Sequence, residues 1–136
     1  MKSVDEAILA LVNGDLSALQ IVTEAEHQDL LAASQRLPKL TLSRHALARV
    51  LRSLRDGAWD PKDVQLWSSF MRRGYVAGNL VGGQPSISID YDEQDEELII
   101  EVQSRLDEIG DMIDGLISRA ELEQMLRNLE AVRAER

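Results

Sequence analysis

The sequence has 136 residues, and its 15 Lys and Arg against 24 Asp and Glu give a formal net charge of −9. A chain of this length supports one hydrophobic core, so we expect a single domain over residues 1–136. The acidic balance argues against non-specific nucleic-acid binding and docking on anionic lipid, and the absence of cysteine excludes disulfides and thiolate chemistry.

The chain opens with MKSVDEAILALVNGD, in which a short apolar stretch follows acids at Asp5 and Glu6. A signal peptide needs a basic start and a longer apolar run, and a membrane span needs about 20 apolar residues. We therefore expect a cytoplasmic protein with no membrane association.

Helix starts are marked by a repeated local pattern: an apolar residue, then Ser or Asp, then a second apolar residue five positions after the first. The pattern occurs as Leu16-Ser17 with Ile21, Leu42-Ser43 with Leu47, Trp59-Asp60 with Val64, and Ile117-Ser118 with Leu122. The polar side chain caps the first turn while the apolar pair closes over it. Gly14, Gly57 and Gly115 fall where preceding helices would end in a left-handed residue. These signals predict helices over residues 3–13, 17–35, 43–56, 60–73, 93–114 and 118–134.

The fifth predicted helix has the clearest apolar stripe, which advances in steps of three and four residues. Its members are Ile99, Val102, Leu106, Ile109, Ile113 and Leu116. The stripe predicts a helix that faces the core of a bundle. A seam between two copies of the chain is the alternative, and it leaves monomer and homodimer both open. In the fourth predicted helix, Val64, Trp67, Phe70 and Met71 are expected in the core.

Two stretches interrupt the helices. Residues 36–41 read as a connector in which Pro38 ends the second helix. Residues 74–86 contain four glycines and a proline, and with residues 87–92 they are interpreted as a flexible loop and a short extended arm. The sequence thus predicts an all-α, single-domain bundle of about five to six helices. Residues 1–40 are a possible helical hairpin appended to a core over residues 41–136.

Charge is unevenly distributed along the chain. The net charge is −4 over residues 1–36, +5 over 37–80 and −10 over 81–136. We expect the basic middle to face carboxylates of the fifth helix through some of its arginines. The candidates are Arg49, Arg52, Arg55, Arg72 and Arg73.

The densest acidic run covers residues 90–97, with six acids in eight positions. Acids in a first helical turn complement the helix dipole, but that effect does not require six of them. The surplus indicates recognition of a basic surface, with Tyr91 as an aromatic anchor. The predicted partner-binding residues are Asp90, Tyr91, Asp92, Glu93, Asp95, Glu96 and Glu97.

No motif in the sequence indicates catalysis. The glycine-rich loop lacks the ending of a phosphate-binding loop, and no nucleophile elbow occurs. A calcium loop centred on Gly115 would place Gly110 and Met112 at ligand positions, where oxygen ligands are needed. His27 and His45 have no ligand at helical spacing and are interpreted as surface residues. We expect a protein that is not an enzyme and has no cofactor or metal.

Two connector-helix units, residues 56–67 (DGAWDPKDVQLW) and 114–122 (DGLISRAEL), resemble the turn-then-helix pattern of small acidic helical bacterial immunity proteins. Those proteins neutralise colicin-type toxins or toxins of contact-dependent growth inhibition. The resemblance covers about residues 41–134 and leaves residues 1–40 unmatched. It implies a cytoplasmic antidote that occludes a basic toxin domain, often a nuclease, through an acidic surface.

Two other functions are compatible with the sequence. The basic helices within residues 43–73 could form a helix-turn-helix that binds DNA. Against this, Arg72 and Arg73 lie at the C-terminal end of the second helix, whereas bases are read near its N-terminus. A homo-oligomeric structural or adaptor protein that buries the apolar stripe is the third hypothesis.

Overall fold

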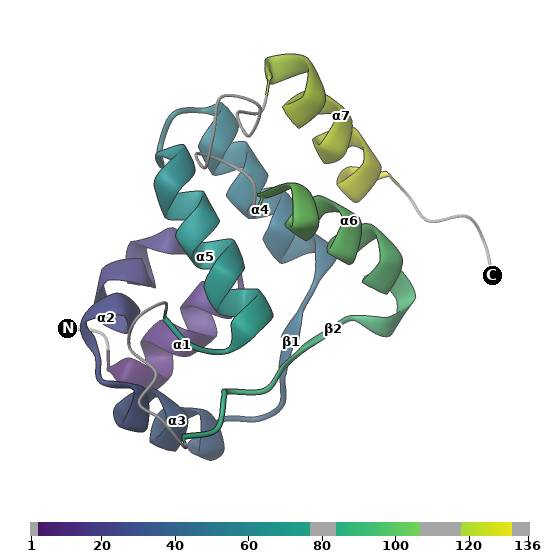
Figure 1. Ribbon diagram of the computed structural model, residues 1–136. Helices are drawn as coiled ribbons and strands as arrows, with labels where there is room; N and C mark the ends of the chain where they lie inside the picture. Colours follow the sequence, from purple (N-terminus) through teal and green to yellow (C-terminus); the bar gives the residue numbers. More distant parts are fainter. Residues whose placement is uncertain (1–2, 77–83, 107–117, 132–136) are drawn as a thin grey trace.

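The computed structural model describes residues 3–76, 84–106 and 118–131, and it is mostly helical (Figure 1). This part of the chain has seven α-helices, two short 3-10 helices and two short strands. They are α1 (Val4–Val12), η1 (Leu16–Ala18), α2 (Leu19–Glu24), α3 (His27–Arg36), β1 (Leu40–Leu42), α4 (Arg44–Arg55), α5 (Pro61–Arg73), β2 (Ile89–Tyr91), η2 (Glu93–Asp95), α6 (Glu96–Leu106) and α7 (Arg119–Glu130). The helical class agrees with the sequence prediction, whereas the helix count and the small sheet differ from it.

Two of the four predicted side-chain caps are confirmed, and Asp60 holds the N-cap position of α5 without a capping hydrogen bond from its side chain. Ser43 and Ser118 accept hydrogen bonds of 3.1 Å from the backbone N–H of Ala46 and Glu121, and Asp60 precedes Pro61 at the start of α5. The fourth cap is Asp15 instead of Ser17, because the Asp15 carboxylate accepts the Ser17 N–H at 3.0 Å. Local capping chemistry thus places most helix starts to within a residue or two.

The predicted single helix over residues 17–35 is wrong. The backbone is extended at Ala25 and Glu26, with ψ of 150° and 148°, and this break separates α2 from α3. A straight helix of that length would span nearly 30 Å. The break instead allows both short helices to pack on α1, which buries Val22 in α2 and Leu30 in α3.

The second difference is a parallel sheet between β1 and β2, with Leu40 opposite Ile89 and Leu42 opposite Tyr91. The sequence predicts an extended arm over residues 87–92 and no sheet. The partner of this arm is β1, which overlaps the end of the segment 36–41 interpreted as a connector. In β1, Leu40 and Leu42 are buried in the core and Thr41 is exposed. Asp92 continues the ladder by donating its N–H to the Leu42 carbonyl at 3.0 Å. The sheet thereby fixes where the acidic run begins.

The apolar core joins residues of all seven α-helices. Trp67, Phe70 and Met71 of α5 are buried as predicted, and Trp67 Nε1 donates to the Leu11 carbonyl of α1 at 2.8 Å. From the apolar stripe, Ile99, Val102 and Leu106 are buried. Its remaining members, Ile109, Ile113 and Leu116, lie outside the described residues.

Glycines of positive φ end three helical segments. Gly14 and Gly57 have φ of +87° and +77°, as predicted, and Gly74 ends α5 with φ of +79°. Gly115 lies outside the described residues. No helix within the described ranges is long and apolar enough to cross a membrane.

Candidate functional site: an acidic face on α6

The structure divides the seven predicted partner-binding residues into two groups. In the first group, Asp90 lies 3.3 Å from the Lys39 ammonium. The Asp92 carboxylate caps η2 by accepting the Gln94 N–H at 3.1 Å. Both carboxylates therefore have contacts within the molecule.

Tyr91 belongs to the same group. It is half-buried, and its hydroxyl donates to Gln103 Oε1 at 2.5 Å. Gln103 is fully buried in α6, and its Nε2 donates to the Ser68 carbonyl of α5 at 3.1 Å. Tyr91 thus connects β2 to α6 and α5, and its hydroxyl already has a partner within the molecule.

We expect the Tyr91→Phe variant to lose about 1–3 kcal/mol of unfolding free energy, because the buried Gln103 oxygen loses its donor. Urea denaturation measures this loss. Tyr75→Phe is the matched control, since the Tyr75 hydroxyl has no hydrogen bond among the described residues and its removal should change stability little. Equal stability of the two variants would show that the Tyr91 hydroxyl does not support the fold.

Asp95 completes the first group. Its side chain is only 6% exposed, and its Oδ2 lies 3.8 Å from Nε of Arg44, whose side chain is 12% exposed. Arg44 also donates from Nη1 to the Ala131 carbonyl at 2.8 Å, just after the end of α7. This buried pair connects η2, α4 and the end of α7, so Asp95 is not presented to a partner.

The second group consists of Glu93, Glu96 and Glu97, which are exposed at the start of α6. Two residues of the next turn extend their surface: Ile100, which is 42% exposed, and the exposed Glu101. None of the four glutamates has a hydrogen bond or ion pair among the described residues. We call this set of five residues the α6 acidic face.

The α6 acidic face is a continuous surface. Positions three and four apart lie next to one another on a helix, which places Glu97, Ile100 and Glu101 side by side. Like charges at this spacing destabilise an isolated helix by a few tenths of a kcal/mol each. Glu96 and Glu97 complement the dipole in the first turn of α6, whereas Glu101, one turn further on, does not. Together they place unpaired negative charge next to an exposed aliphatic side chain.

Sequence reasoning missed Ile100 and Glu101. A signal for both was present, because Ile100 lies off the apolar stripe of Ile99, Val102 and Leu106. An isoleucine off the stripe of an amphipathic helix is expected to face solvent, and Glu101 is one turn after Glu97.

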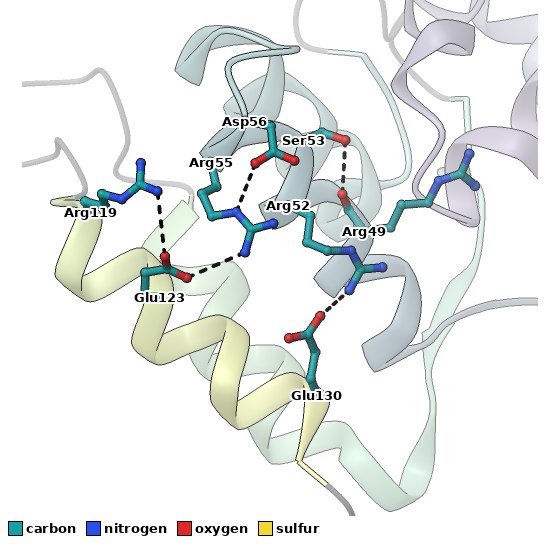
Figure 2. A network of polar contacts seen from close by, with 8 residues as sticks. All are labelled: Arg49, Arg52, Ser53, Arg55, Asp56, Arg119, Glu123 and Glu130. Atoms are coloured by element: carbon teal, nitrogen blue, oxygen red, sulfur yellow. Dashed lines mark hydrogen bonds and ion pairs between the residues drawn. The ribbon is translucent and has the colours of Figure 1, made fainter.

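A second charged region lies between α4 and α7 (Figure 2). Arg52 pairs with Glu130, and Arg55 lies 3.0 Å from Asp56 and 3.6 Å from Glu123. The hydrogen bond with Asp56 raises the pKa of the Arg55 guanidinium, with a smaller contribution from Glu123. The partners of Arg52 and Arg55 within the described residues are Glu130 and Glu123 on α7 and Asp56 at the end of α4. The acids at 107–114 of the predicted fifth helix lie outside the described residues.

Apolar packing explains that partnership. Leu122, Met125, Leu126 and Leu129 bury one side of α7, and α7 packs along α4. The acids that flank this apolar side then lie opposite the α4 arginines. Arg44, Arg52 and Arg55 are thereby engaged within the molecule, and Arg49 donates to the Asn13 carbonyl at 3.5 Å. This reduces the basic surface that a helix-turn-helix would offer to phosphates.

The two histidines differ in their exposure to solvent. His45 is exposed, as predicted. His27 is only 2% exposed, and its Nε2 lies 2.7 Å from the Pro85 carbonyl. The prediction that His27 is a surface residue is wrong, because residues far along the chain cover it. Its spacing to other residues on its own helix could not reveal that contact.

No known family model matches this chain, and no curated protein or solved structure matches it. Across residues 3–76, 84–106 and 118–131, no group of three or more His, Cys, Asp or Glu could hold a metal ion. Most of the segment compared with a calcium loop, residues 107–117, lies outside the described residues.

Proposed function

We propose that this chain is a non-enzymatic protein-binding module that docks on a basic partner through the α6 acidic face. In its most concrete form, it is an immunity-type inhibitor that occludes a basic toxin domain such as a nuclease. The observation that carries the proposal is the set of four unpaired, exposed glutamates around the exposed Ile100.

Charge and apolar area have different roles in such an interface. Four carboxylates on one side of the molecule attract a cationic surface over a distance and accelerate association. A central aliphatic side chain that becomes buried contributes to the lifetime of the complex. Ile100 takes the anchoring role that the sequence assigned to Tyr91. A standard interface buries about 800 Å² on each partner, so elements next to α6 would contribute as well.

The other two hypotheses have less support. DNA binding through residues 43–73 would need the arginines that contact α7 and Asn13. Assembly through the apolar stripe would need Ile99, Val102 and Leu106, which are buried within their own chain. A second copy would also bring two α6 acidic faces together, which charge repulsion opposes.

The test is a four-glutamine variant in which Glu93, Glu96, Glu97 and Glu101 become Gln. The proposal requires a gene for a basic toxin beside the gene of this chain, and the partner in the assay is the toxin domain that such a gene encodes. We expect the association rate at low salt to fall about 10–1,000-fold, with a weaker dependence on salt. Stopped-flow mixing at several sodium chloride concentrations measures both quantities.

A variant of the same net charge separates the α6 acidic face from bulk charge. It carries Glu24→Gln, Glu26→Gln, Asp29→Asn and Asp60→Asn, all exposed positions outside α6. We expect its association rate to remain within about threefold of the parent, since screening limits the effect of distant charges. Equal slowing of the two variants would exclude the α6 acidic face as the docking surface. Failure of the parent protein to bind would exclude the inhibitor proposal.

A further inference from the structure

A groove lies beside the α6 acidic face, between α6 and α7. Its volume is about 400 Å³, at the lower end of the range for small-molecule pockets. The lining residues are Glu101, Val102, Ser104 and Arg105 from α6, and Glu121 and Met125 from α7. Glu101 belongs both to this groove and to the α6 acidic face, so the two surfaces are continuous.

The charged side chains that line the groove differ in whether they have a partner of opposite charge. Arg105 makes a bidentate contact with Glu121, with Nε 2.6 Å from Oε2 and Nη2 3.0 Å from Oε1. This pair is neutral and holds α6 against α7. Glu101 has no ion pair or hydrogen bond among the described residues. The unneutralised charge of the lining is thus negative, and it stands beside the apolar side chains of Val102 and Met125.

We propose that the groove receives an arginine side chain of the basic partner, a step that rests on the proposed docking through α6. The guanidinium binds the Glu101 carboxylate, and the aliphatic part of the arginine lies against Met125 and Val102. Arginine fits because its planar donors match a carboxylate in two hydrogen bonds and because it is more weakly hydrated than lysine. An uncharged occupant would leave the Glu101 carboxylate partly desolvated without a counter-charge.

The probe is Nα-acetyl-arginine amide, added to the full chain with ¹³C-labelled methionine methyl groups. We expect a saturable shift of the Met125 methyl signal, while Met71, buried in α5, serves as the internal reference. The citrulline analogue has the same shape without the charge and should bind about fivefold more weakly, the upper range for a solvent-accessible ion pair. Glu101→Gln should weaken arginine binding by a similar factor.

Ser104→Trp fills the groove from an exposed position and should abolish the Met125 response. Glu26→Gln, at an exposed position outside α6 and the groove, should leave it intact. Equal binding of arginine and citrulline, or no Met125 shift with arginine, would overturn the proposal. If Met125 does not respond but the four-glutamine variant still slows association with the toxin domain, the groove proposal fails alone. If Met125 responds as expected but the toxin domain does not bind, the groove binds arginine and the proposed function fails.

Discussion

Replacing Asp95 by alanine is expected to lower the free energy of unfolding by about 3 kcal/mol, because removing one member of a buried ion pair leaves the other charge uncompensated. The charge left behind is the guanidinium of Arg44, whose side chain is 12% exposed. Urea denaturation at neutral pH measures the loss. Glu96→Ala is the matched control one position further on, where the exposed and unpaired carboxylate predicts a change within about 0.5 kcal/mol.

A double variant tests the origin of this effect. Arg44→Met together with Asp95→Leu removes both charges and should recover much of the stability, since buried ion pairs can often be replaced by apolar residues without loss. Similar small losses for Asp95→Ala and Glu96→Ala would mean that Asp95 is effectively solvated. Asp95 would then belong with the partner-facing residues, as the sequence predicted.

The acidic run therefore combines two kinds of residue that look alike in the sequence. Asp90, Asp92 and Asp95 contact Lys39, the backbone of η2 and Arg44. Glu93, Glu96 and Glu97 have no such contact. An alanine variant at Asp92 or Asp95 would disturb folding as well as binding, so only the second set can report on a partner.

Local chemistry made much of the helical architecture predictable. Ser43 and Ser118 cap helices as their patterns require, Asp60 precedes Pro61 at the start of α5, and Gly14 and Gly57 adopt the expected left-handed conformation. These features depend on residues within one turn of the position itself. The break at Ala25 and Glu26 has no such local signal, because it serves the packing of α2 and α3 on α1.

The sheet and the distribution of roles within the candidate site depend on contacts between distant segments. Pairing of Leu40 with Ile89 joins two three-residue strands 49 positions apart, and strands this short give no reliable periodic pattern. The same applies to the hydrogen bond from Tyr91 to Gln103 and to the ion pair of Asp95 with Arg44. The sequence located the excess of acids, but only the tertiary contacts separate the supporting residues from the exposed ones.

Gly74→Ala is expected to lower the free energy of unfolding by about 3 kcal/mol or more, through two additive causes. Gly74 has φ of +79°, and a Cβ there would lie 2.1 Å from the Ile87 carbonyl oxygen. Gly57→Ala is the matched control, since Gly57 has nearly the same φ, +77°, and no atom within 4 Å of its Cβ position. The control should lose only the backbone contribution of about 1–2 kcal/mol.

The difference between the two alanine variants bears directly on the candidate site. The Gly74 carbonyl accepts the N–H of Ile87 at 2.9 Å, and Ile87 is buried two residues before β2. Because β2 leads through η2 into α6, displacing Ile87 moves the start of the α6 acidic face. Gly74→Ala should therefore slow association with the toxin domain even where the variant is still folded, whereas Gly57→Ala should not. Equal stability and equal association rates for the two variants would show that this close approach does not position α6.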